Sequence, residues 1–223
     1  MATQWEIDFD YDNFEDVLYE AGLQAFTEIQ DQYDGETFYT FGFEASSIFE
    51  APRIMACTEE RLYSHAMDKY AEYKEEADFT LDEAIANLRY NYLAYYETGL
   101  DYDDKAAFAQ VRDMMHYEWQ GQITDMEDHS LHQLKYYTET DVWEYHYNRM
   151  EAKFLKVINR LDAQTIFERS NVRSSITLFL RRLDYYPEFL HDRSMEMINP
   201  PDVVKRFHGE RKRAVALCEL LPF

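Results

Sequence analysis

Residues 36–62 read ETFYTFGFEASSIFEAPRIMACTEERL, and this segment carries the strongest fold signal in the chain. Its first nine residues are rich in aromatic residues and Thr, which favours a β-strand over 36–44. A second apolar run, RIMACT at 53–58, follows after a short connection, so an antiparallel pair of strands is the economical arrangement. Thr58 is followed by two Glu residues, and this pattern is typical of a helix start because Thr caps free N–H groups and acids complement the helix dipole.

Amphipathic helices are expected on both sides of this segment. From residue 13 to residue 33 the apolar side chains recur at steps of three and four, and Asp34-Gly35 ends the pattern. The sequence TLDE at 80–83 is a capping box, which starts another helix. The stretch LRYNYLAYY that follows, at 88–96, fits a helix or a strand, because Tyr is also a good strand former.

The second half of the chain continues the alternation of helices and strands. Helical patterns cover 103–115 and 131–160, and SSITLFL at 174–180 is a strand candidate. Asn199, followed by two Pro residues, is a natural cap for a last helix. Strands separated by helices predict an α+β fold: a helix-rich single domain, residues 1–223, with a small antiparallel sheet.

The composition is that of a globular protein. The chain has 223 residues, of which 46% are hydrophobic and 17% aromatic, so its high charge does not indicate disorder. No apolar stretch approaches the roughly 18 residues of a membrane-spanning helix, and the N-terminus lacks the pattern of a secretory signal. Two cysteines, Cys57 and Cys218, provide no disulfide framework. These features predict a cytoplasmic protein.

The charge is strongly negative and unevenly distributed. Asp and Glu number 44 against 22 Lys and Arg, a net charge of -22. Residues 1–150 hold 34 of the acids and 9 of the bases, whereas residues 151–223 are close to neutral, with a slight basic excess. Such a surface serves either solubility or the docking of a basic protein. It repels phosphate, so neither nucleic acid nor an anionic membrane is an expected direct partner.

Motifs of catalysis or metal binding are weak or absent. His129 and His132 could share a helix face beside Glu127 and Asp128, which leaves an enzyme with a carboxylate–His site as one alternative. Adjacent acid pairs do not face one another on a helix, and there is no nucleophile elbow, phosphate loop or CxxC pair. We therefore expect no enzyme activity, no catalytic residues, no metal and no cofactor.

Tyrosine crowds the central acidic third of the chain. Tyr has a large rigid ring and a polar tip, which suits an interface, and together with acids it matches a partner rich in Arg and Lys. The alternative is that these rings only fill a half-buried core, as the helical spacing over 88–96 would also allow. The predicted partner-binding residues are Tyr102, Asp103, Asp104, Tyr137, Glu139, Asp141, Trp143 and Glu144.

Three stretches together resemble a bacterial family known as domain of unknown function 4303. ETFYTFGFE (36–44), running on to ACTEERL (56–62), is similar to the family's first two strands and its Thr-Glu-Glu helix start. LRYNYLAYYETG (88–99) is similar to a family segment in which Trp stands at the positions of Tyr90 and Tyr95. INPPDVVKRF (198–207) resembles the Asn-Pro entry to the family's closing helix.

The resemblance implies a small bacterial cytosolic protein without known catalytic residues. Members resemble proteins encoded beside secreted polymorphic toxins, which implies an immunity role. The charge argument points the same way, so the leading hypothesis is a non-enzymatic protein that binds and occludes a basic toxin domain. The second hypothesis is a nucleic-acid mimic that blocks a DNA-binding factor. The oligomeric state stays open.

Overall fold

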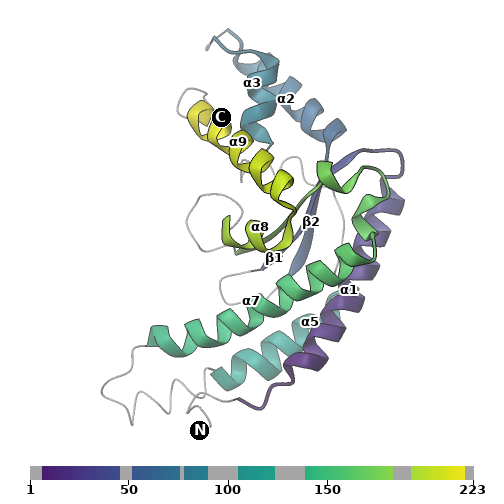
Figure 1. Ribbon diagram of the computed structural model, residues 1–223, viewed down its shortest axis with the longest axis vertical. Helices are drawn as coiled ribbons and strands as arrows, with labels where there is room; N and C mark the ends of the chain where they lie inside the picture. Colours follow the sequence, from purple (N-terminus) through teal and green to yellow (C-terminus); the bar gives the residue numbers. More distant parts are fainter. Residues whose placement is uncertain are drawn as a thin grey trace.

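The computed structural model describes residues 7–45, 52–75, 78–89, 105–123, 139–182 and 192–218, which form a small sheet with helices on both faces (Figure 1). In these segments the sheet has the strand order β2-β1-β3, with β1 at Phe38–Ala45, β2 at Arg53–Thr58 and β3 at Thr177–Arg182. β1 and β2 are antiparallel, which confirms the pair expected from the sequence. β3 runs parallel to β1, so the sheet as a whole is mixed.

Helices make up most of the described chain, and the α+β prediction is confirmed. None of the helices in the described segments is long and apolar enough to cross a membrane. The sequence did not predict α8 or the π-helix η1. The helices are α1 (Tyr11–Gln32), α2 (Glu59–Tyr73), α3 (Leu81–Leu88), α5 (Ala109–Asp113), η1 (Met114–Gln120), α7 (Glu139–Ala163), α8 (Asp192–Ile198) and α9 (Pro201–Cys218), with 3-10 turns at Ile166–Glu168 (η2) and Arg173–Ser175 (η3).

Local capping explains where α1, α2 and α3 begin. The Asp10 carboxylate accepts hydrogen bonds from two backbone N–H groups in the first turn of α1. Thr58 caps α2, as expected. Thr80 and Glu83 form the complete capping box of α3, since each side chain accepts from the backbone N–H of the other residue.

The expectation that Asn199 caps the last helix is wrong. α9 begins at Pro201, and the N–H of Val204 donates to the C=O of Pro200, which places Pro200 at the cap. The Asn199 amide instead binds β3. Its Nδ2 donates to the C=O of Leu178 at 2.7 Å, and its Oδ1 accepts from the N–H of Leu178 at 2.9 Å. A single side chain thus supplies the partners that the backbone of an edge strand would otherwise lack.

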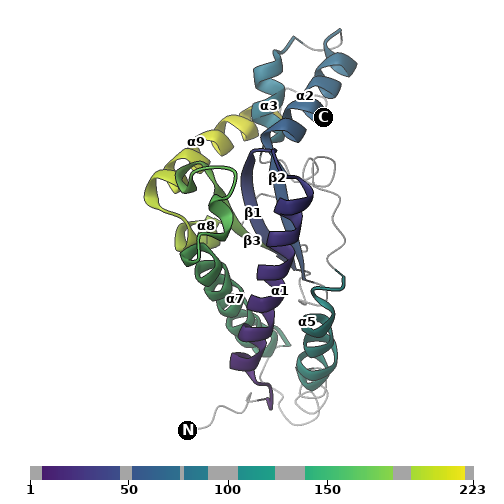
Figure 2. The same ribbon diagram turned by 90° about the vertical axis from the view of Figure 1, so that its right-hand side faces the viewer.

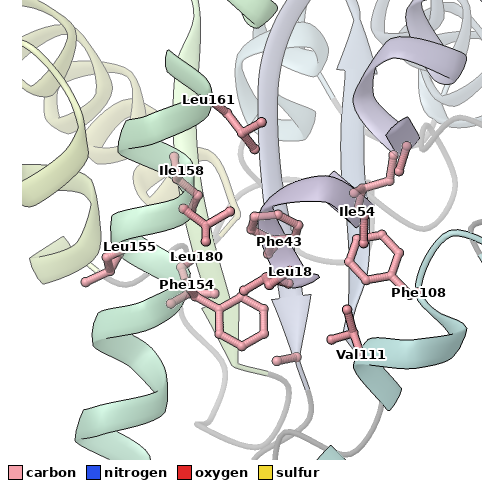
Figure 3. Close-up of a cluster of buried hydrophobic side chains, with 14 of the residues drawn as sticks. Leu18, Phe43, Ile54, Phe108, Val111, Phe154, Leu155, Ile158, Leu161 and Leu180 are labelled. Atoms are coloured by element: carbon pink, nitrogen blue, oxygen red, sulfur yellow. The ribbon is translucent and has the colours of Figure 1, made fainter. Parts of the chain in front are cut away.

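One face of the sheet packs against α1, α5 and α7, and α1 lies between the other two helices (Figure 2). Phe43 of β1 lies at the centre of this core, with Leu18 of α1 beside it (Figure 3). Its ring centroid is 5.5 Å from that of Phe154 on α7 and 6.0 Å from that of Phe108 before α5. Edge-to-face contacts of this kind add about 0.5–1.5 kcal/mol each to the gain from burial.

The opposite face packs against α2, α3 and α9. Tyr39 and Cys57 are buried there together with Phe179 of β3, in a second apolar cluster. Phe179 lies directly over Gly42 of β1. A Cβ at position 42 would come within 2.4 Å of the backbone oxygen of Phe179 and 2.6 Å of its ring. The close approach of these two strands therefore requires glycine.

Candidate functional site

The structure describes only part of the predicted partner-binding set. Tyr102, Asp103, Asp104 and Tyr137 lie outside the described residues, as do the alternative site at 127–132 and the tyrosines of 90–96. The other members occupy the first turns of α7, where only the backbone is described. Helical spacing puts Glu139 and Trp143 on one face and Asp141 and Glu144 on another. The binding role of these residues stays a prediction.

A network of ion pairs joins acids of α1 to bases in the second half of α7. Its centre is Glu15, whose side chain is only 6% exposed. The Glu15 carboxylate accepts hydrogen bonds from Lys153 at 3.0 Å, Lys156 at 2.8 Å and Arg160 at 3.1 Å. Asp12 and Asp16, on either side, pair with Lys153 and Arg160. A buried carboxylate surrounded by three bases fixes the position of α1 against α7.

The ion pairs shift the pKa values of their members. Burial raises the pKa of the Glu15 carboxyl, but the hydrogen bonds from Lys156 and Lys153 outweigh burial and leave this pKa below its ordinary value. The hydrogen bond from Lys153 lowers the pKa of Asp12. Burial lowers the pKa of the Lys153 ammonium, and the hydrogen bonds to Asp12 and Glu15 more than compensate, so that pKa lies above its ordinary value. These groups stay charged at neutral pH.

Ion pairs also connect the two ends of the sequence, which differ in charge. Bases from the C-terminal third of the sequence pair with acids from the first third: besides the α1–α7 network, Arg169 pairs with Asp31, and Arg181 pairs with Glu44. Each of these bases therefore has an acidic partner within the chain. The remaining exposed acids of α1 lie on the side of the helix that does not face α7.

Glu44 is a second buried carboxylate, on the sheet face that packs against α2, α3 and α9. The strand register places it opposite Arg53 of β2 and Arg181 of β3. Nε of Arg53 donates to Glu44 Oε1 at 2.6 Å, and Nη1 of Arg181 lies 2.9 Å from Glu44 Oε2. Burying a charge is costly unless it is paired, and here both neighbouring strands supply a partner. The ion pairs of Glu44 with Arg53 and Arg181 hold the three strands together at one end of the sheet.

A buried polar cluster joins α1, η1 and α7. Nε1 of Trp119 donates to the hydroxyl of Tyr11 at 3.2 Å, and this hydroxyl lies 3.0 Å from Nδ1 of His146. An indole N–H can only donate, so the Tyr11 oxygen is the acceptor of the Trp119 bond and links Trp119 to His146. The guanidinium carbon of Arg149 lies 4.0 Å from the centre of the Tyr11 ring. Tyr11, Trp119 and His146 are all buried, so these contacts position the start of α1.

A groove of about 650 Å³ runs along α1, between this helix and the segment that leads into α5. The residues at positions 16, 20, 24 and 28 of α1 form its exposed rim, since each lies one helical step of four beyond the last. Apolar side chains form its floor, and Gln110 lies on the opposite wall. The lining residues are Asp16, Val17, Glu20, Ala21, Leu23, Gln24, Thr27, Glu28, Ala107 and Gln110.

The described part of the chain contains no group of three or more His, Cys, Asp or Glu residues that could hold a metal ion. Comparison with known proteins places the chain in a family. The family model described as domain of unknown function (DUF4303) matches residues 18–200. The chain belongs to the DUF4303 family. No curated protein and no solved structure matches it.

The matched range of the DUF4303 chain contains most of α1, the whole sheet and α8, and it ends one residue before α9. Two of the three family-like stretches, 36–62 and 88–99, meet inside it. Arg89 donates two hydrogen bonds to the carboxylate of Glu59, at 2.7 and 2.6 Å, and its guanidinium carbon lies 4.7 Å from the centre of the Tyr39 ring. Tyr39 donates to the C=O of Arg89 at 3.3 Å. These motif residues therefore fasten α2 and α3 to β1.

The groove of this DUF4303 chain was missed in the sequence. One signal was present: Asp16, Glu20 and Glu28 repeat at multiples of four along an amphipathic helix, which gives one acidic row. No sequence signal indicated the opposite wall, because Ala107 and Gln110 come close to α1 only through tertiary packing.

Proposed function

We propose that this DUF4303 protein is a non-enzymatic binding protein that docks a basic protein partner. A single observation carries the proposal: an acid-rimmed groove lies on the surface of a chain with net charge -22. Opposite charges speed the encounter of two proteins, and buried apolar contacts then hold the complex. Tyr102, Tyr137 and Trp143 remain the aromatic anchors that we propose from the sequence.

The partner class that fits best is a toxin domain with a basic surface. An acidic protein in the cytoplasm can cover such a surface and keep the toxin from its substrate. The immunity role implied by the family resemblance has this mechanism. The pairing of the C-terminal bases with α1 supports it, because Lys156, Arg160 and Arg169 lie against Glu15, Asp16 and Asp31 and not against Glu20.

A nucleic-acid mimic is supported less well. Four residues of α-helix rise about 6 Å, so the rim offers at most one charge in that distance, and Gln24 interrupts the row. DNA carries one charge in about 1.7 Å of its axis. The apolar floor behind the acids also has no counterpart in a phosphate backbone, whereas it suits a protein side chain.

The proposal is tested by capture and inhibition. The purified chain serves as bait in a lysate of the bacterium that encodes it, bound proteins are eluted with increasing salt, and their activities are measured with and without an equimolar amount of the chain. We expect a basic protein whose activity falls to background when the chain is added. Recovery of acidic partners only, or of a basic partner whose activity is unchanged, would contradict the proposal.

A further inference from the structure

We propose that the groove between α1 and residues 107–110 binds a basic amphipathic helix of the partner. The inference rests on the proposed function and deepens it by naming the surface and the shape of what it binds. Nothing in the sequence-based site includes α1.

The floor of the groove suits apolar side chains. Val17 and Leu23 of α1 are only partly buried, and they line the groove together with Ala21 and Ala107. A volume of about 650 Å³ lies within the range of about 300–1,000 Å³ typical of pockets that bury a ligand. Burying apolar side chains here would supply most of the affinity, because exposed ion pairs contribute little.

The rim suits Lys and Arg side chains at helical spacing. From Asp16 to Glu28 the axis of α1 rises about 18 Å, the length of about twelve residues of a second helix. Rim positions repeat every four residues, and a helix presents one face with the same repeat. A partner helix lying along the groove can therefore set basic residues against Glu20 and Glu28 while its apolar face enters the groove. The occupant is thus a helix that is basic on one side and apolar on the other.

The probe for this inference is a fluorescein-labelled peptide of Leu and Lys, about eighteen residues long, with its Leu residues on one helical face. A second peptide has the same composition in shuffled order. Binding is measured by fluorescence anisotropy, and the bound region is mapped by hydrogen exchange. We expect the amphipathic peptide to bind more tightly than the shuffled one and to slow hydrogen exchange in α1.

Two pairs of variants separate the groove from general charge attraction. Glu20→Lys reverses a charge on the rim, and Asp68→Lys makes the same change on the exposed side of α2, on the far side of the sheet. Gln110→Trp fills the groove from an exposed position, and Ser64→Trp places the same ring on α2. We expect Glu20→Lys and Gln110→Trp each to weaken peptide binding by about fivefold or more, and the α2 variants to change it by less than about twofold. Urea denaturation verifies that every variant is folded, and Gln24→Trp, which blocks the groove from the α1 side, provides a second obstruction.

Three results would overturn the inference. Equal losses for Glu20→Lys and Asp68→Lys would show that only net charge matters. Unchanged binding by both Trp variants of the groove would show that the peptide binds elsewhere. Protection of α1 that grows with protein concentration in the absence of peptide would show that a second copy of the chain occupies the groove. In each case a basic partner recovered by capture would leave the proposed function standing, whereas failure to find such a partner would remove the proposed function itself.

Discussion

At Gly42 the backbone of β1 lies so close to Phe179 of β3 that no side chain fits. A Cβ there would meet a backbone oxygen at 2.4 Å, and a backbone atom cannot turn aside as a flexible side chain can. We expect Gly42→Ala to lower the free energy of unfolding by about 3 kcal/mol, at the upper end for overpacked sites. Urea denaturation measures the loss. Gly209→Ala is the control, because nothing lies within 4 Å of its Cβ, and in a helix the change stabilises by about 0.5–1 kcal/mol. Equal behaviour of the two variants would contradict this account of β1 and β3.

Asn199 tests whether one side chain completes the outer edge of β3. In Asn199→Ala the N–H and C=O of Leu178 both lose their side-chain partner, and an unsatisfied buried polar group costs about 1–3 kcal/mol. We expect a loss of about 3 kcal/mol in the free energy of unfolding, measured by urea denaturation. Asn159→Ala, at an exposed site on α7, should change it by no more than about 0.5 kcal/mol. A loss as small as that for Asn199→Ala would mean that the edge of β3 does not depend on the amide.

At the scale of the element, the contact of α1 with α7 depends on the ionisation of Glu15. Its pKa is lowered in the folded protein, so its stabilisation is fully present above the pKa of the unfolded chain and is lost as pH falls through the folded pKa. We expect Glu15→Gln to cost about 2 kcal/mol of unfolding free energy near pH 7. The difference from the wild-type chain should shrink as pH falls below about 4.5, the ordinary pKa of Glu.

Thermal or urea denaturation of both chains over a pH series measures this effect. Glu118→Gln changes an exposed acid on η1 and should alter stability by no more than about 0.5 kcal/mol at every pH. A Glu15→Gln penalty that stays constant down to pH 3 would refute an ionic origin.

The elements that the sequence predicts correctly are those whose signals are local. α1 follows from its apolar spacing, α2 and α3 from the caps at Thr58 and Thr80, and the β1–β2 pair from one segment of 27 residues at 36–62. The parallel pairing of β3 with β1 joins residues more than 130 positions apart, so no local pattern encodes it. The role of Asn199 was predicted wrongly for a different reason: Asn can cap a helix or bind a strand backbone, and the sequence alone does not distinguish the two. The helix at 103–115 begins only at Ala109 within the described chain, where Lys105 to Phe108 form a turn.

At the scale of the whole molecule, the net charge could be predicted from the sequence, but the positions of the charged side chains in the fold could not. The sequence showed the acidic excess of residues 1–150. It did not show that C-terminal bases would pair with Glu15, Asp16 and Asp31, or that Glu20 and Glu28 would line a groove. The predicted site residues between Tyr102 and Glu144 came from composition alone, whereas the groove requires two segments about 80 residues apart to pack together.

The central claim is that the acidic surface steers a basic partner, and the most direct test is the association rate constant with the captured partner in a salt series. The interaction between two exposed charges is largely screened beyond about 8–10 Å at physiological ionic strength, and beyond about 3 Å at 1 M salt. Stopped-flow fluorescence of the mixed proteins measures the rate. We expect it to fall by about tenfold or more between low salt and about 0.5 M NaCl, while the dissociation rate changes little. An association rate that is unchanged over this range would contradict the claim.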